Sequence, residues 1–216
     1  MAFDLPDRGL FLLNGSGQAP SRKHYVEESK PNQGCFHMEW FERLNEYFPE
    51  HEMKDRRQLQ ALIEDKDVYH KEETDEYLLL YAEFPTFIFI DYLLIKPERR
   101  GKGVGTKVLN QLKKKGKDII LEVEPIDHED EDTLRRANFY LKNGFVKADR
   151  IQYEREDQSG EPYEMKIYYW TPKEELPQEL VLEKMAKACQ EIHNFRSKRY
   201  YGRVVADPED VLRLKQ

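Results

Sequence analysis

The chain has 216 residues and a formal net charge of −7, with 36% charged and 12% aromatic residues. The acidic balance argues against binding nucleic acid through its phosphates, and the aromatic content supplies enough apolar surface for a folded core. No stretch approaches the roughly 18 apolar residues of a membrane span and the amino terminus lacks a signal-peptide pattern, so we expect a soluble, cytoplasmic protein that binds neither membrane nor nucleic acid.

The first predicted elements are an arm and two helices. Residues 1–37 are rich in Gly, Pro, Ser and charge, which predicts an N-terminal arm. Apolar residues at helical spacing then predict helices over residues 39–47 and 53–63, separated by Pro49.

Three strands are predicted next. Residues 68–71 and 77–84 form a plausible hairpin. Residues 87–95 are almost unbroken apolar and rich in aromatic and β-branched side chains, which indicates a strand buried on both faces. Pro97 cannot donate to a sheet, so this strand should end before it.

The central strand leads into a glycine-rich turn, Arg100-Gly101-Lys102-Gly103-Val104-Gly105. Apolar residues at helical spacing follow, so a helix should begin near Gly103. The first turn of a helix presents unpaired N–H groups, and glycines remove the Cβ atoms that would keep a ligand away from them. The pattern therefore favours binding of a diphosphate. The spacing fits neither a Walker A loop nor the G-x-G-x-x-G of a Rossmann fold.

Residues 118–123 predict another apolar strand, and an acidic loop and a helix ending in Tyr140-Leu141-Lys142-Asn143-Gly144-Phe145 follow it. The glycine-rich turn resembles the R/Q-x-x-G-x-G/A signature of the GNAT superfamily of acetyl-CoA-dependent N-acetyltransferases. The later helix resembles the Y-x-x-x-G-F motif of the same family. The two motifs occur in the family's order, and the resemblance spans residues 38–172.

The resemblance implies that acetyl-CoA, the acyl donor, lies between two splayed central strands. Strand backbone would pair with the pantetheine, the glycine-rich turn would hold the diphosphate, and Tyr140 would protonate the departing thiolate. The implied cofactor-binding residues are Leu94, Ile95, Arg100, Gly101, Lys102, Gly103, Val104, Gly105, Thr106 and Asn138. The chain departs from the family at Thr133 and Arg136, where Asn and Ala are common, which leaves the contacts of that helix to the cofactor open.

The rest of the chain completes the predicted fold. A hairpin over 146–155 and 163–170 gives an α+β fold with a mostly antiparallel sheet flanked by helices, as in the GNAT family. Residues 173–216 form a C-terminal helical extension. Its amphipathic helix, from Val181 to Phe195, should pack on the chain's own sheet, and a dimer contact is the alternative, so both monomer and homodimer stay open. A short helix capped by Asp207 should follow.

Several carboxylates are candidates for proton transfer. Asp91 is the only acidic residue in the central strand, so an inward-facing carboxylate there would be partly desolvated, which makes it a candidate general base. The alternative is that Asp91 is hydrogen-bonded to a neighbouring loop or helix end. Glu122 and Glu124 are comparable candidates, and GNAT enzymes often use ordered water instead of a side-chain base.

The densest acidic cluster lies where the acceptor cleft of the family opens. Electrostatic steering there favours a cationic acceptor, such as a polyamine, an aminoglycoside-like amine or a lysine side chain. The alternative is a solvated loop whose acids support the following helix. The cluster comprises Glu122, Glu124, Asp127, Glu129, Asp130, Glu131 and Asp132. The cysteines and histidines show no metal-ligand spacing, so we expect no structural metal.

The favoured function is acetyl transfer from acetyl-CoA to a primary amine, directly within a ternary complex. The alternative is an acyl-CoA-binding module of the same fold that acts through a protein partner without turnover. Small amines, protein N-termini and lysine side chains all stay open as acceptors, because loops and flanking helices build the acceptor half of this fold.

Overall fold

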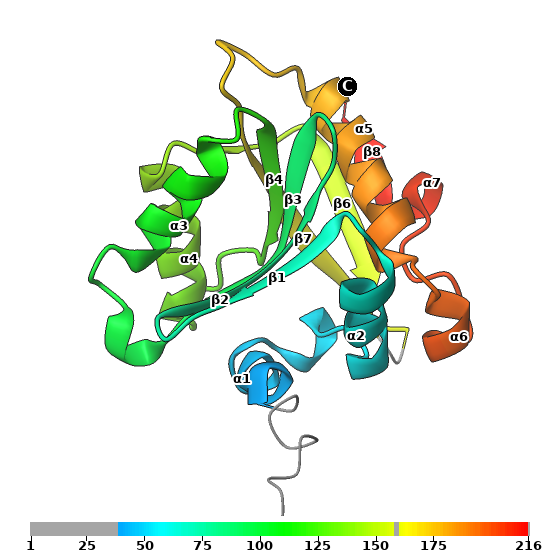
Figure 1. The fold of residues 1–216 in the computed structure, drawn as a ribbon. Helices are drawn as coiled ribbons and strands as arrows, with labels where there is room; N and C mark the ends of the chain where they lie inside the picture. Colours follow the sequence, from blue (N-terminus) through cyan, green and yellow to red (C-terminus); the bar gives the residue numbers. More distant parts are fainter. Residues whose placement is uncertain (1–38, 158–159, 216) are drawn as a thin grey trace, which may run out of the picture.

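The computed structural model describes residues 39–157 and 160–215, so the predicted N-terminal arm, residues 1–37, lies outside the described residues. An eight-stranded sheet forms the centre, in the order β1-β2-β3-β4-β7-β6-β8, with β5 also paired to β7 (Figure 1). The strands are β1 Tyr69–Glu73, β2 Tyr77–Glu83, β3 Phe87–Ile95, β4 Asp118–Val123, β5 Val146–Lys147, β6 Ile151–Glu156, β7 Pro162–Trp170 and β8 Leu212–Leu214.

Helices cover both faces of this sheet (Figure 1). The α-helices are α1 Glu39–Tyr47, α2 Arg56–Asp65, α3 Val104–Lys113, α4 Glu131–Lys142, α5 Gln178–Ala188, α6 Ser197–Tyr201 and α7 Pro208–Val211. Every strand pair is antiparallel except β3–β4, which is parallel. The expected α+β fold with a mostly antiparallel sheet is therefore confirmed.

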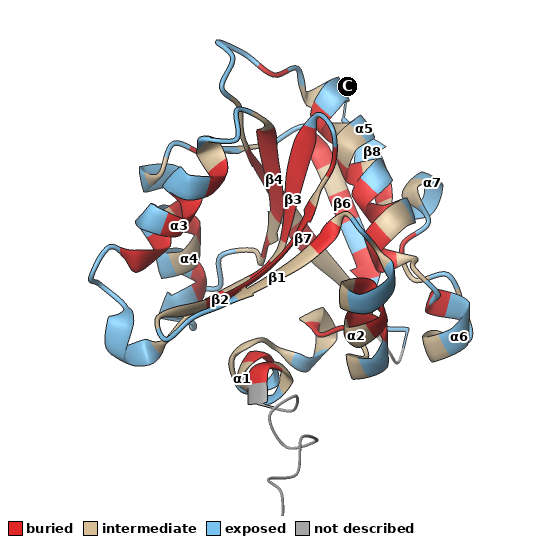
Figure 2. Ribbon diagram, viewed as in Figure 1, coloured by how far each residue is buried: buried red, intermediate tan, exposed pale blue. Residues whose placement is uncertain are grey.

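The core has two layers, one on each face of the sheet. Helices α3 and α4 pack on one face, around side chains such as Leu109 and Ile119. Helices α1, α2 and α5 pack on the other, around Leu44, Leu62 and Met185. Because both faces are covered, β3 and β4 read as continuous apolar runs rather than alternating ones, and Figure 2 shows both strands as buried.

The central pair of strands stays together for only part of its length. The β3–β4 register runs from Phe87 opposite Asp118 to Ile90 opposite Leu121, although β3 continues to Ile95. On its other side β3 has a bulge at Asp91, since Ile90 and Tyr92 pair with consecutive residues of β2. A bulge bends its strand and strengthens the local twist, so β3 leaves β4 where the extra residue is inserted. The sheet is thereby opened at its centre.

Two predicted elements have different bounds. The helix predicted over 53–63 begins at Arg56, because the Asp55 carboxylate accepts a hydrogen bond from the Arg57 N–H and caps the helix there. The strand predicted over 146–155 is divided into β5 and β6, because the Ile151 N–H donates to the Ala148 carbonyl and closes a turn between the two strands.

The C-terminal extension belongs to the same core as the rest of the fold. The apolar side of α5 and of the following π-helical turn, Cys189–His193, is fully buried against the sheet, as shown by Val181, Met185 and Ile192. Packing on the chain's own sheet is therefore confirmed. The capped helix α7 is also confirmed, whereas β8, which pairs with β6, was not foreseen. Among the described residues, no helix is long and apolar enough to span a bilayer.

Replacing Met185 with Ala should destabilise the fold by about 2–5 kcal/mol, because the cavity left in a fully packed layer is only partly refilled. Denaturant titration would measure the change in the free energy of unfolding. Leu180→Ala, on the exposed side of the same helix, is the matched control and should change it by less than about 0.5 kcal/mol. Equal effects of the two substitutions would contradict this packing of α5.

Candidate active site

A cavity of about 760 Å³ lies where β3 and β4 part. Its volume is within the range of small-molecule sites, roughly 300–1,000 Å³. The glycine-rich turn and α3 form one end, where Tyr47 of α1 lies beside Arg100, and the loop before α2 and the strands β6 and β7 line the other. Helix α4 closes the side between them. The parting of the two strands therefore produces a site with two distinct ends.

The glycine-rich turn is shaped by backbone conformations that favour glycine. Gly101 and Gly103 have φ angles of +73° and +77°, and Gly103 is the N-cap of α3. A Cβ on Gly105 would lie 2.8 Å from the Phe139 ring, so a side chain there would push α3 and α4 apart. The turn thus leaves the first N–H groups of α3 facing the cavity without side chains over them.

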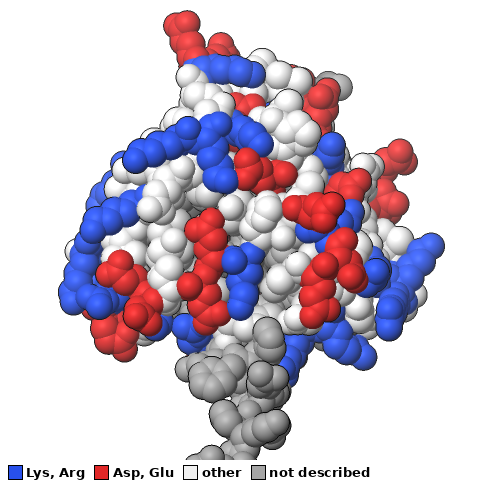
Figure 3. Space-filling model, in the orientation of Figure 1, with Lys and Arg blue, Asp and Glu red and all other residues white. Residues whose placement is uncertain are grey.

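Arg100 is held in place at the same end of the cavity. Its Nε donates to the Ile95 carbonyl at 3.2 Å, and its guanidinium lies 4.5 Å from the centre of the Tyr47 ring. Lys and Arg side chains gather along the side of the molecule where α3 lies (Figure 3). This end of the cavity therefore favours an anion.

The structure brings most of the predicted cofactor residues to this cavity. Those that line it are Ile95, Arg100, Gly101, Gly103, Val104, Gly105 and Thr106. Lys102 and Asn138 are exposed and do not line it, and Leu94 points into the core on the opposite face. Leu93 lines the cavity as well. The expected pairing of Leu94 and Ile95 with the pantetheine is made through the backbone, so it stays a prediction.

Tyr140 lines the cavity from α4 and also packs against the sheet. Its ring lies 5.6 Å from Phe145 and 6.4 Å from Tyr168, measured between ring centres. Burial raises the pKa of Tyr140 above its ordinary value, although the charge of Arg136 acts in the opposite direction. The phenol therefore stays protonated at neutral pH.

Asp91 faces the cavity but both of its oxygens have partners. Lys54 Nζ donates to one at 2.5 Å and the Tyr69 hydroxyl donates to the other at 2.6 Å. The loop before α2 thus supplies the partner that the alternative interpretation expected. The role of Asp91 as a general base stays a prediction.

Glu122 has three side-chain partners, one more than Asp91. Its carboxylate accepts from the Tyr153 hydroxyl at 2.8 Å and lies 2.7 Å from His193 Nε2 and 3.2 Å from Arg155. Burial alone would raise the pKa of Glu122, but these partners lower it below its ordinary value, so the group is ionised. Burial lowers the pKa of His193 to about 4, so the imidazole is neutral at pH 7. Sequence reasoning missed Arg155 and His193, since neither belongs to a local motif.

Glu124 and Glu52 lie close to each other and to Arg136. The Arg136 guanidinium is 2.6 Å from Glu124 and 3.9 Å from Glu52. The Glu52 side chain is only 10% exposed, and its Oε1 is buried without a hydrogen-bond partner among the described residues. Burial, followed by the charge of Glu124, raises the pKa of Glu52 to about 8. Sequence reasoning missed this residue too.

His51, Glu52 and Glu124 each offer a ligand atom within 4.8 Å of the others, and they are the group in the described part of the chain whose spacing could suit a metal ion. The Arg136 guanidinium already supplies a cation to this group through its contact with Glu124. We therefore propose no metal there.

The other acids of the predicted cluster support α4. Asp130 caps the helix by accepting from the Asp132 N–H, and Asp132 pairs with Arg135 at 2.8 Å. Thr133, one of the two departures from the GNAT pattern, uses its hydroxyl to bond Asp127 and Asp130 within the same loop. The alternative interpretation therefore describes most of this loop, and Glu122 and Asp132 are the members of the cluster that line the cavity.

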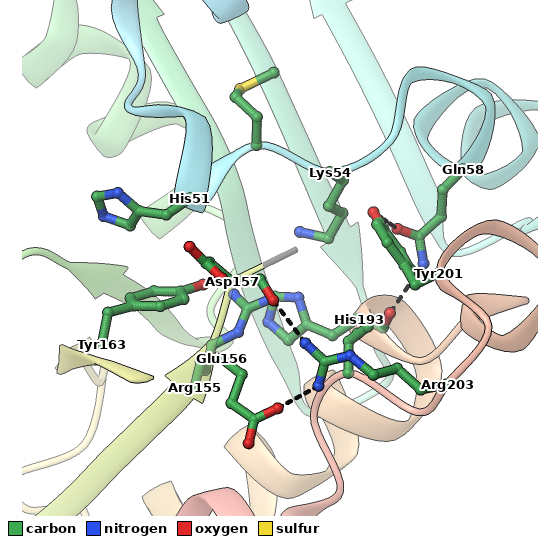
Figure 4. Close-up of a pocket in the computed structure, with 12 residues that line it drawn as sticks. His51, Lys54, Gln58, Arg155, Glu156, Asp157, Tyr163, His193, Tyr201 and Arg203 are labelled. Carbon is green, nitrogen blue, oxygen red and sulfur yellow. Dashed lines mark hydrogen bonds and ion pairs between the residues drawn. The ribbon is translucent and has the colours of Figure 1, made fainter. Parts of the chain in front are cut away.

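A smaller cavity of about 30 Å³ lies next to the main one and shares Lys54 and Arg155 with it (Figure 4). The C-terminal extension forms one wall of this smaller cavity. Gln58 donates to the carbonyl of His193 at 2.9 Å, and the Tyr201 hydroxyl donates to Gln58 and accepts from the Asp55 N–H. The extension thereby holds the loop that carries Glu52 and Lys54.

Comparison with known proteins gives consistent results. The family described as an acetyltransferase (GNAT) domain matches residues 63–147. "Putative acetyltransferase YjbC" of Bacillus subtilis strain 168 is 41% identical over 179 residues, which cover 82% of this chain and 93% of that protein. Among solved structures, a GNAT-family acetyltransferase from Bacteroides thetaiotaomicron aligns with a TM-score of 0.58 at 22% identity, over 79% of this chain and 94% of its own.

Glu52 should make the fold less stable as the pH rises. Its pKa in the folded state is above the unfolded value of 4.5, so its contribution to stability is complete below pH 4.5 and is lost as the pH rises through about 8. Glu52→Gln should remove this loss. Melting temperatures of both proteins from acidic to alkaline pH would show the wild type falling relative to the variant, and parallel curves would contradict the assigned pKa.

Proposed function

The chain belongs to the GNAT superfamily of acetyltransferases, and on that premise we propose that it transfers an acetyl group from acetyl-CoA to a primary amine. The observation that carries the proposal is the cavity at the parted strands, which places an anion-binding glycine-rich turn and a protonated phenol, Tyr140, along one continuous space. The 41% identical relative, named as an acetyltransferase, supports the same reaction class.

The glycine-rich turn fits a diphosphate. A Cβ at Gly101 or Gly103 would project into open space, with no atom within 4 Å, so glycine keeps that space free for a ligand. The N–H groups at the start of α3 would donate to the phosphate oxygens, and Arg100 would add a positive charge. The backbone conformation of the turn, in addition to its charge, therefore supports binding of a diphosphate there.

The edge of β3 that has left β4 fits the pantetheine arm. Among residues 39–157 and 160–215, the strand that pairs with this part of β3, beyond Ile90, is β2. An amide-bearing chain lying along residues 93–95 could take the hydrogen bonds that β4 no longer makes. This arrangement would lead the thioester from the glycine-rich turn toward Asp91 and Tyr140.

Bound acetyl-CoA supplies a thioester carbonyl that an amine can attack. The amine nitrogen would form a bond to the carbonyl carbon as the carbon–sulfur bond breaks, and the proton that the nitrogen loses would restore the Tyr140 hydroxyl after it has protonated the sulfur. Tyr140 would donate its hydroxyl proton to the departing sulfur. The raised pKa of Tyr140 keeps this proton in place until the thiolate develops.

Acetyl-CoA should stabilise the protein, by about 2.7 kcal/mol at a concentration 100 times its dissociation constant. Gly103→Ala should weaken binding about tenfold, because alanine resists the left-handed conformation that the turn needs. Thermal shift and calorimetry would measure both effects. Gly116→Ala is the control, since Gly116 has a φ of +67° away from the cavity and should lose stability without losing affinity.

Tyr140→Phe should lower the turnover number by about 10²–10⁴-fold, the usual contribution of a positioned acid, and leave the stabilisation by acetyl-CoA unchanged. Release of CoA with a panel of primary amines would provide the rate. Tyr168→Phe, a neighbouring phenol outside the cavity lining, should keep full activity. Full activity in Tyr140→Phe would remove it as the acid, and binding without turnover by the wild type would favour a binding module.

A further inference from the structure

The carboxylates that line the large cavity differ in whether they have a cation of their own. They are Glu52, Asp91, Glu122 and Asp132. Asp91 is paired with Lys54, Glu122 with Arg155 and Asp132 with Arg135, each at 3.2 Å or less. In the part of the chain that the structure describes, the cation paired with Glu52 is Arg136 at 3.9 Å, and that guanidinium is bonded to Glu124 at 2.6 Å. One carboxylate of the cavity therefore lacks a cation at hydrogen-bond distance.

We propose that Glu52 binds the acceptor substrate as a primary ammonium ion and accepts the proton that the ammonium must lose before it attacks the thioester. This inference rests on the proposed acetyl transfer and names the acceptor class and the base for that same site.

The charges around Glu52 support this assignment. With both carboxylates ionised, Glu52, Glu124 and Arg136 carry a net charge of −1, and a bound ammonium would balance it. Titratable and charged groups surround Glu52 from η1 (Glu50–Glu52), the loop before α2, β3, β4, β6, β7, α1 and α4. They are His51, Lys54, Tyr92, Glu122, Glu124, Arg155, Tyr163, Tyr47, Arg136 and Tyr140. Lys54, Glu122 and Arg155 already have opposite charges as partners. A cation entering the cavity therefore finds its unbalanced partner at Glu52.

The position of Glu52 is fixed by strand β3. The Tyr92 hydroxyl donates to the Glu52 carbonyl at 2.8 Å and accepts from the Lys54 N–H at 3.1 Å. The unpartnered Oε1 is buried in the cavity wall that Tyr140 also lines. The Tyr92 hydroxyl thus holds the backbone of Glu52 and of Lys54 in place. A catalytic carboxylate requires such a fixed position.

Burial also suits Glu52 to proton transfer. In water an alkylammonium ion and a glutamic acid differ by about six pKa units, so the proton stays on nitrogen. Desolvation favours the neutral form of both groups, raising the pKa of the acid and lowering that of the amine. The raised pKa of Glu52, about 8, brings it closer to the pKa of the ammonium ion. The proton can then move from the ammonium nitrogen to the Glu52 carboxylate, which leaves the neutral amine that attacks the thioester.

The test compares Glu52→Gln with Glu50→Gln, an exposed glutamate on the same turn, at saturating acetyl-CoA. The probes are propylamine, spermidine and Nα-acetyl-lysine amide. We expect Glu52→Gln to lose at least 100-fold in kcat with the best of these probes, to keep the wild-type thermal shift with acetyl-CoA, and to remain folded. Glu50→Gln should retain wild-type rates.

The pH profile separates proton transfer from a structural role. In the wild type, kcat/KM for the amine should rise with pH and level off near pH 8, where Glu52 becomes ionised. In Glu52→Gln it should keep rising about tenfold per pH unit toward the pKa of the free amine, near 10, because only neutral amine can then react. A break near pH 8 that persists in the variant, or wild-type kcat in the variant, would overturn the inference while leaving acetyl transfer intact. A wild type that releases no CoA with any amine would instead overturn the proposed function and this inference with it.

Discussion

The parting of β3 from β4 is the constraint on which the rest of this structure depends. The two strands share hydrogen bonds only from Phe87 to Ile90, and the bulge at Asp91 then turns β3 away. Strand edges that separate inside a folded sheet leave polar backbone groups that need partners, so the opening is suited to a ligand with amide groups. The same opening admits charged side chains to the centre of the molecule, and their placement determines what chemistry can occur there.

Burying those charged side chains costs free energy of desolvation, and the fold offsets this cost by pairing them with opposite charges. Glu122 illustrates this, since it is held by groups from β6 and from the C-terminal extension, including Tyr153, Arg155 and His193. Replacing a buried ion pair with apolar residues is often neutral or stabilising, so such pairs are weak evidence for stability. Their contribution here is positional, because they hold charged side chains such as Glu122 and Arg155 in the lining of the cavity. The C-terminal extension is therefore part of the site rather than an appendage.

The sequence predicted the elements whose information is local. The strand 87–95, the glycine-rich turn, the strand 118–123 and helix α1 occur where their patterns placed them, because buried runs, glycines and caps act over a few residues. The bulge at Asp91 was not foreseen, because a β-bulge depends on how two strands pair rather than on local spacing. An acid inside an apolar run, Asp91, was the available signal of that irregularity. Glu52, Arg155 and His193 could not be foreseen, because tertiary contacts rather than spacing bring them together.

The two ends of the cavity come from different parts of the chain. Under the proposed function, the donor end is the end formed by the glycine-rich turn, and it is built almost entirely between Phe87 and Lys147, within the residues that match the acetyltransferase family. The acceptor end is the opposite one, and it draws on the loop before α2 and on β6, with the C-terminal extension holding that loop. Substitutions can therefore accumulate at the acceptor end without disturbing the glycine-rich turn. Over evolution, such a division allows descendants of one ancestor to keep a common donor and diverge in acceptor, and it marks the loop around Glu52 as the place where a directed-evolution library should begin.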